Sequence, residues 1–331
     1  MPKYILSIGE MLIDFIPDTP TDVGVGGMPC YHPHPGGAPA NVAVAIARLG
    51  GAARFIGKLS EDGFGQLLAQ VLVDNHVDTL YIRTTRQAPT SLALVTLSVN
   101  GQRQFTFYRQ GTADTRLEVG NLDWNAWQDA AICHAGSVSL SVEPSRSATF
   151  AAMDYTRQVG SIVSFDANIR PALWVSDTEI REAIREAIGR SDVLKFSAEE
   201  AGFMDEQRNL PEERLDMNQL RTLGAALLAQ GPSLVIITLD AHGAFLMTAN
   251  AQVEVPAAPV KAVDTTGAGD AFMGAILHGL VQQGCSTPTD LRQLSVEELR
   301  NLGAFANRVA GLSVTRYGGI SSLPFINEVQ V

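Results

Sequence analysis

Short runs of apolar residues alternate with longer amphipathic stretches along most of the chain. Apolar residues spaced by three or four positions indicate a helix, whereas short apolar runs indicate a strand. Strands are predicted over 54–57, 131–135, 161–166, 192–196 and 234–239, and helices over 65–75, 145–159, 178–189, 219–230, 268–283 and 296–312. Because strands that alternate with helices form a parallel sheet covered on both faces, the pattern predicts an α/β fold with a doubly wound, mostly parallel, Rossmann-like sheet.

The N-terminal part departs from this alternation. Residues 4–16 indicate a strand with an acidic break, and 38–49 indicate a buried helix of small residues. Between them, residues 17–39 are too rich in glycine and proline to form a long helix. We therefore expect a short excursion from the main body before the first helix.

Two extended segments, 91–99 and 102–109, are joined by Asn100-Gly101, a dipeptide typical of tight hairpin turns. A hairpin that covers the mouth of an α/β sheet is suited to act as a lid. We expect one domain over 1–331, with a small β lid formed by about 12–35 and 90–110.

Composition and charge narrow the class of protein. Of 331 residues, 46% are hydrophobic and 18% charged, which allows a large buried core. The net charge of −11 disfavours a body that binds nucleic acid, because an acidic surface repels the phosphate backbone. Three scattered cysteines without a CxxC motif, and no apolar run of signal or membrane-span length, favour a protein of the cytoplasm without membrane contact.

The most specific motif is Asp-Thr-Thr-Gly-Ala-Gly-Asp at 264–270. Gly267, Ala268 and Gly269 let backbone N–H groups approach a ligand, and the helix that follows adds the positive end of its dipole, which makes an anion site. A carboxylate there would repel phosphate unless it serves as a general base toward an attacking hydroxyl. Asp270 is therefore a candidate base, and capping of the helix is its alternative role.

This motif, together with Gly-Gly-Ala-Pro-Ala-Asn at 36–41, resembles the ribokinase-like (PfkB) family of carbohydrate kinases, and the likeness runs along essentially the whole chain. The resemblance implies ATP-dependent phosphorylation of a sugar hydroxyl, with Asp270 as catalytic base and the amides of 267–269 as anion hole. It also implies that Asp264 and Thr266 lie near a monovalent-cation site, with K⁺ as the candidate ion. The Walker pattern GxxxxGK[ST] is absent, so the phosphate cradle must lie elsewhere, and residue 267 supplies one.

Residues that would hold the sugar fall in four segments. Asn41 either binds sugar hydroxyls or is satisfied locally, and Arg170, in an Asp-Ala-Asn-Ile-Arg element, binds the substrate or forms a structural ion pair. The run Phe-Tyr-Arg at 107–109 resembles the fructokinase branch, and its aromatic residues either cover the sugar or pack the lid, including across a dimer interface. The candidate sugar-binding residues are Asp14, Gly36, Gly37, Asn41, Phe107, Arg109, Asp166, Asn168 and Arg170, with Phe105 beside them.

The nucleotide side carries two departures from the family pattern. Ser197 stands where the NxxE element has Asn, while Glu200 keeps the spacing of the glutamate that orients the water shell of Mg²⁺. Asp240 replaces a glycine in the TLGxxG turn. If this position has a positive φ, aspartate adopts that conformation less readily than glycine does. The candidate ATP-binding residues are Ser197, Thr238, Gly243, Gly267, Gly269, Asn307 and Gly318, and a solvated helix face is the alternative for Asn307.

The expectation that follows is a MgATP-dependent kinase that phosphorylates a primary hydroxyl of a furanose, with fructose as the leading substrate and a homodimer as the assembly. A 2-keto-3-deoxygluconate kinase and an aminoimidazole riboside or nucleoside kinase would share every motif. A sugar-binding regulator without catalysis remains a different class. An NAD-dependent dehydrogenase is disfavoured, because the first strand lacks the glycine fingerprint.

Overall fold

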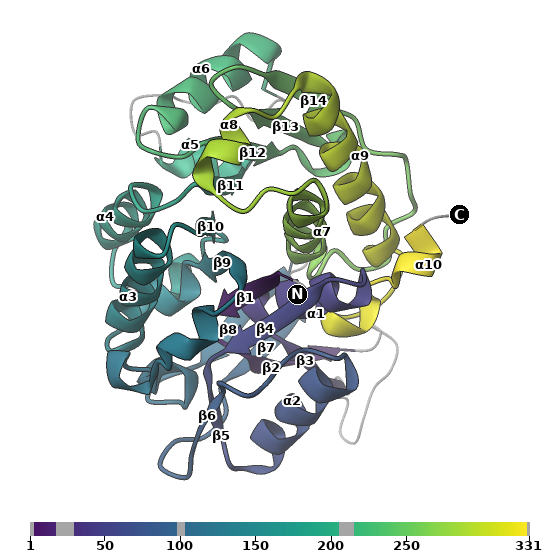
Figure 1. Cartoon of the computed structure of the whole chain (residues 1–331). Coiled ribbons are helices and arrows are strands. Elements are labelled where there is room, and N and C mark those ends of the chain that lie inside the picture. Colours follow the sequence, from purple (N-terminus) through teal and green to yellow (C-terminus); the bar gives the residue numbers. More distant parts are fainter. Residues whose placement is uncertain (1–2, 18–29, 98–102, 205–214, 330–331) are drawn as a thin grey trace.

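The computed structural model describes residues 3–17, 30–97, 103–204 and 215–329 (Figure 1). Its central sheet has eight strands in the order β14-β13-β12-β11-β10-β9-β1-β4. Six of them are parallel, and β13 and β14 are antiparallel at one edge. The strands are β1 (Tyr4–Ile8), β4 (Ala52–Ile56), β9 (Ala130–Gly136), β10 (Ile162–Asp166), β11 (Val193–Ser197), β12 (Leu234–Thr238), β13 (Ala244–Met247) and β14 (Gln252–Val255). The predicted doubly wound α/β fold is confirmed.

Helices cover both faces of this sheet because successive strand residues point to opposite sides. Ile5 and Ile236 face one apolar core, whereas their neighbours Leu6 and Ile237 face the other. The first core is completed by α1 (Ala38–Arg48), α2 (Gly63–Asp74), α7 (Ala268–Gln282), α8 (Pro288–Arg292) and α9 (Val296–Ser313). The second is completed by α3 (Ser145–Gln158), α4 (Asp177–Ile188), α5 (Ala198–Met204) and α6 (Met217–Leu228), while α10 (Ile326–Val329) follows α9 near the C-terminus.

A second sheet has the strand order β3-β2-β7-β8. It is formed by β2 (Leu12–Pro17), β3 (Tyr31–Gly36), β7 (Leu92–Leu97) and β8 (Arg103–Tyr108), so it joins two segments that are far apart in the sequence. The predicted antiparallel pairing of the hairpin strands is confirmed, while its turn at Asn100-Gly101 lies outside the described residues. A short parallel pair, β5 (Lys58–Ser60) with β6 (Arg83–Thr85), lies beside this sheet.

The strand predicted over 4–16 is in fact two strands in two different sheets. Gly9 has a φ of +150°, and a Cβ there would lie 2.6 Å from the Pro39 ring. The chain therefore turns after Ile8, leaves the central sheet and enters the second sheet at Leu12. This turn places Glu10 and Met11 at the carboxyl end of β1, where ligands of open α/β sheets bind.

No helix in the described ranges is both long and apolar enough to cross a lipid bilayer.

Candidate active site

A cavity of about 310 Å³ lies at the carboxyl ends of the central strands, between the second sheet and the start of α7. A larger open depression of about 660 Å³, beside Glu61 and Arg86, holds none of the candidate residues. The cavity is lined by eleven of the sequence-predicted residues, namely Asp14, Gly37, Asn41, Phe107, Asp166, Asn168, Arg170, Thr266, Gly267, Gly269 and Asp270, and by Phe105. It also contains two charged residues that sequence reasoning missed, Glu10 and Lys195.

Asp270 is in the first turn of α7 and is 8% exposed. Its Oδ2 accepts a hydrogen bond of 2.7 Å from Nδ2 of Asn41 on α1. The N-cap position of α7 belongs to Gly267, which makes no side-chain cap, so the capping role considered for Asp270 is wrong. Burial raises the pKa of Asp270 to about 6, with Asp166 acting in the same direction and Asn41, Lys195 and Arg170 against it. The result is a carboxylate that is ionised at pH 7 and more basic than an ordinary aspartate.

The segment before α7 is shaped for close approach to an anion. Gly267 has a φ of +76°, in the left-handed region that favours glycine, and a Cβ at Gly269 would lie 3.4 Å from Nζ of Lys195. The N–H groups of a first helical turn have no acceptor within the helix, so they can donate to a bound group. Ala268 already donates to the Thr265 carbonyl at 3.2 Å, which leaves the amides of the two glycines as the better donors.

Asp264 fastens this segment to the turn after α9. It is 2% exposed, and its two carboxylate oxygens accept hydrogen bonds from the backbone N–H of Thr266 at 2.7 Å and of Gly318 at 2.9 Å. Among the described residues, no three His, Cys, Asp or Glu side chains gather as a metal site would require.

Lys195 lies in the middle of the buried strand β11. Its Nζ donates to both carboxylate oxygens of Asp166, at 2.8 and 3.0 Å, and both side chains are buried. Burial lowers the pKa of Lys195, but Asp166, Glu200 and Asp270 raise it by more, so the ammonium group stays charged. One signal could have identified it: a lone cation between Leu194 and Phe196 in an apolar strand needs a buried partner.

Arg109 does not line the cavity. Its Nε is 2.6 Å from Oδ2 of Asp114, and Nη1 donates to Ser141 at 2.9 Å, so the guanidinium lies behind the cavity wall formed by Glu10 and Val138. Gly36 is also absent from the cavity lining, because it pairs with Leu12 at the end of β3. A Cβ at Gly36 would lie 2.1 Å from Oδ2 of Asp14, so this glycine leaves room for the Asp14 carboxylate.

The predicted nucleotide-side residues other than Gly267 and Gly269 lie outside this cavity. Glu200 accepts hydrogen bonds from the backbone N–H of Ile169 at 2.7 Å and of Ser197 at 2.8 Å, and so joins the loop after β10 to the start of α5. Asn307 is buried and donates to the carbonyl oxygen of Val255 at 2.9 Å, so the alternative of a solvated helix face is wrong. Of the remaining residues, Thr238 ends β12, Gly243 has a φ of +106° and Gly318 a φ of +87°.

Asp240 adopts the left-handed conformation that the sequence analysis considered, with a φ of +51°. Its side chain is exposed in the turn between β12 and β13. The departure from glycine is therefore accommodated without a buried charge.

Gly37 lines the cavity, and its replacement should lower the free energy of unfolding by a predictable amount. Its φ is +104°, and a Cβ would lie 2.6 Å from the Glu10 carbonyl oxygen. Gly50 is a matched control, because its φ is +87° but nothing lies within 4 Å of its Cβ position. We expect Gly50→Ala to destabilise the protein by about 1–2 kcal/mol through backbone strain alone, and Gly37→Ala by a further ~1–3 kcal/mol through the collision. Urea denaturation measures both, and equal losses would contradict the collision.

The chain is similar to known carbohydrate kinases along nearly its whole length. The family profile described as pfkB family carbohydrate kinase matches residues 2–326. Fructokinase-1 of Oryza sativa subsp. japonica is 39% identical over 329 residues, which are 99% of this chain and 96% of that protein. The crystal structure of fructokinase with bound ATP from Xylella fastidiosa superposes with a TM-score of 0.87 at 34% identity, covering 100% of this chain and 98% of that one. The fructokinase of Vibrio cholerae O395, in its fructose, ADP and calcium ion bound form, superposes with a TM-score of 0.82 at 32% identity, covering 99% and 98%.

Proposed function

The chain belongs to the pfkB family of carbohydrate kinases, and we propose that it transfers the γ-phosphoryl group of ATP to the terminal primary hydroxyl of fructose, giving fructose 6-phosphate. The observation that carries this proposal is the position of Asp270. A buried carboxylate, oriented by Asn41, stands beside Gly267 and Gly269 at the N-terminus of α7, in a cavity of about 310 Å³. That volume is at the lower end of the range for small-molecule sites, about 300–1,000 Å³.

Phosphoryl transfer needs positioning and charge stabilisation more than covalent chemistry. Asp270 takes the proton of the attacking hydroxyl, and the amides of Gly267 and Gly269 stabilise the charge that develops on the phosphoryl group. Lys195 and Arg170 add positive charge to a cavity that also holds Asp14 and Asp166.

Mg²⁺ and a monovalent cation belong to the same proposal. Both oxygens of Glu200 accept backbone hydrogen bonds, yet a carboxylate has about four acceptor sites, so capacity remains for water molecules around Mg²⁺. Bound Mg²⁺ would neutralise charge on the ATP phosphates. K⁺ is proposed beside the buried carboxylate of Asp264 and near Thr266, and the dependence of the rate on K⁺ against tetramethylammonium tests this.

We propose that the second sheet is the lid of a one-domain kinase. Phe105 and Phe107 stack at 6.0 Å between ring centroids on β8, and the Arg170 guanidinium lies 5.9 Å from the Phe105 ring. Closure of this sheet over the sugar would exclude water and suppress hydrolysis of ATP. A homodimer through this sheet is supported by Tyr108, which is 60% exposed, and its test is the molar mass in solution. The three cysteines are free thiols, which supports a cytoplasmic location.

Fructose is favoured over an anionic keto acid by the charges around the cavity. Arg109, which could have met a carboxylate, is held by Asp114 behind the wall. Of the cations that do line the cavity, Lys195 is paired with Asp166 and Arg170 lies over the Phe105 ring, while Glu10 and Asp14 add negative charge. The purified protein should therefore form ADP fastest with fructose in a panel that includes 2-keto-3-deoxygluconate and aminoimidazole riboside. Higher kcat/KM for either alternative would overturn the substrate, and sugar binding without ADP formation would indicate a regulator.

The pH dependence of catalysis tests the assigned base. The pKa of Asp270 is raised to about 6, and only the deprotonated form accepts a proton. We expect kcat/KM for the sugar to fall as pH drops through about 6 and to level off above it. Burial also raises the pKa of Glu10, to about 7, so the profile is measured in both the wild type and Glu10→Gln. A profile of the Glu10→Gln protein that stays flat between pH 5 and 8 would contradict the assignment.

A further inference from the structure

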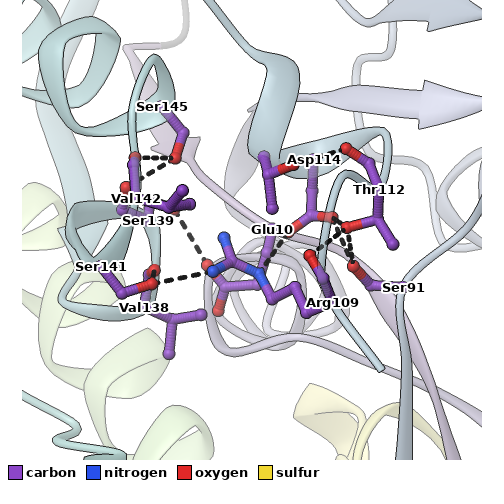
Figure 2. Close-up of polar contacts among 11 residues, drawn as sticks. Glu10, Ser91, Arg109, Thr112, Asp114, Val138, Ser139, Ser141, Val142 and Ser145 are labelled. Atoms are coloured by element: carbon purple, nitrogen blue, oxygen red, sulfur yellow. Dashed lines mark hydrogen bonds and ion pairs between the residues drawn. The ribbon is translucent and has the colours of Figure 1, made fainter. Parts of the chain in front are cut away.

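A buried polar cluster lies where the second sheet joins the central sheet (Figure 2). Its charged members come from the turn after β1 (Glu10), the position directly after β8 (Arg109) and the following 3₁₀ turn (Asp114). Hydroxyl groups surround them, from Ser91, Thr112, Ser139 and Ser141. We refer to these seven residues as the junction cluster.

Within the junction cluster, Arg109 is held rigidly. Oδ2 of Asp114 accepts from its Nε at 2.6 Å, and Oδ1 of Asp114 accepts from the hydroxyls of Ser91 and Thr112. Nη1 of Arg109 donates to Ser141 at 2.9 Å. Its third nitrogen, Nη2, is buried without a hydrogen-bond partner in the described part of the chain. The guanidinium therefore acts as a fixed positive charge beside the cavity wall rather than as a mobile ligand.

Glu10 is the member of the junction cluster that reaches the cavity. It is 2% exposed and lines the cavity together with Asp14 and Asn41. Ser139 donates to its Oε2 at 3.0 Å, and this hydroxyl is the one side-chain donor that reaches the carboxyl group among the described residues. The backbone N–H of Glu10 also donates to this carboxyl group. Since a carboxylate can accept about four hydrogen bonds, acceptor capacity remains for a ligand.

The surroundings of Glu10 fix the position of its backbone and set the balance between its neutral and charged forms. Its backbone is wedged against Gly37, where a Cβ would meet the Glu10 carbonyl oxygen at 2.6 Å. Electrostatically, burial and Asp114 favour the neutral acid, whereas Arg109, the backbone N–H of Glu10 and Ser139 favour the carboxylate. A buried acid at the wall of a polar cavity, backed by a fixed cation, is suited to accept a hydrogen bond from a neutral donor.

We propose that Glu10 binds a hydroxyl group of the sugar substrate, and that Arg109 is a positioning residue. Arg109 donates to Ser141 in the 3₁₀ turn Val138–Ser141, the same turn from which Ser139 donates to the Glu10 carboxyl group. This inference rests on the proposed function, because it assigns a further contact to the same sugar site. A sugar offers hydroxyl donors, which a carboxylate accepts through charge-assisted bonds. A substrate that lacks the matching hydroxyl would leave Glu10 buried and unpaired, so Glu10 contributes to specificity.

The test combines a substitution with substrates that lack single hydroxyls. Glu10→Gln keeps the shape but removes the charge, and we expect KM for fructose to rise roughly ten- to a hundredfold, as for loss of a charge-assisted hydrogen bond. The kcat value and KM for ATP should change by less than about threefold. Among monodeoxy fructoses and 2,5-anhydromannitol, one compound should have the same KM in Glu10→Gln as in the wild type, because it lacks the hydroxyl that Glu10 binds.

A double-mutant cycle tests the role of Arg109. Arg109→Lys keeps a cation for Asp114 but alters its geometry, and its effect on KM should shrink when Glu10→Gln is already present. Glu182→Gln, an exposed glutamate on α4, is the matched control and should behave as the wild type. Should Glu10→Gln fail to fold, Ser139→Ala removes the donor to the same carboxyl group and is measured on the same sugars.

The outcomes separate this inference from the proposed function. An equal penalty for every sugar, or no penalty at all, overturns the contact with Glu10, since a purely structural role does not distinguish hydroxyls. Additive effects in the cycle overturn the positioning role of Arg109. A wild-type protein that is inactive on fructose overturns the proposed substrate. In that case, the ratio of KM in Glu10→Gln to KM in the wild type, measured on the sugar of the panel that is phosphorylated best, still tests Glu10.

Discussion

Replacing Asp270 with asparagine is expected to lower kcat for sugar phosphorylation by at least about 10²–10⁴-fold, the range for loss of a general base. Asparagine fills the same space beside Asn41 but cannot accept the proton of the attacking hydroxyl. Because burial already disfavours the charged form of Asp270, removing its charge should not lower the melting temperature. The measurements are ADP formation at saturating fructose and MgATP, and calorimetric titration of fructose.

The affinity for fructose separates a catalytic role from a binding role. We expect the fructose Kd of Asp270→Asn to remain within about tenfold of the wild type, because Asp14, Asn41 and Arg170 still line the cavity. Asp177→Asn, at the exposed start of α4, is the control for the same chemical change and should leave kcat unchanged. Near-normal turnover of Asp270→Asn would refute the base, and loss of sugar binding would show that Asp270 mainly binds.

The central sheet was predictable because its parallel strands are buried on both faces and stand out as short apolar runs. The antiparallel edge was not, since β13 and β14 are only four residues each and are joined by Thr-Ala-Asn-Ala, which carries no specific turn signal. The division of residues 4–16 between two sheets depends on the approach of Gly9 to Pro39, a contact that no local pattern contains.

The candidate site was predictable where a local motif has its own chemistry, as in 264–270. It was not predictable where distant strands bring charges together. Lys195 and Asp166 are on adjacent parallel strands, and their pairing follows from the strand register, in which these two residues are partners. Glu10 joins the cavity through the turn after β1, whereas Arg109, at the end of a predicted strand, is drawn behind the wall by Asp114. Aligning the strand ends predicts that certain residues lie at the same edge of the sheet. It does not predict which of their side chains form hydrogen bonds or ion pairs with one another.

Replacing Lys195 with methionine should have the largest effect on stability of the changes considered. The ammonium group is the partner of both oxygens of Asp166, and both side chains are buried. Breaking a buried pair by removing one partner costs about 3–5 kcal/mol, because the remaining charge has no compensation. We expect the free energy of unfolding, measured in urea at pH 7, to fall by that amount. The pKa of Asp270 should also rise, because Lys195 opposes its upward shift.

The double variant Lys195→Met with Asp166→Asn tests whether the unpaired charge of Asp166 causes the loss of stability. It removes both charges, so it should recover most of the stability lost by Lys195→Met alone. The kcat of both the single and the double variant should be lower than that of the wild type, because the cation next to Gly269 and the anion-binding amides is missing in each. If the double variant is as unstable as the single one, the unpaired charge of Asp166 is not the cause of the instability. If its kcat returns with its stability, Lys195 supports the active site only by neutralising Asp166.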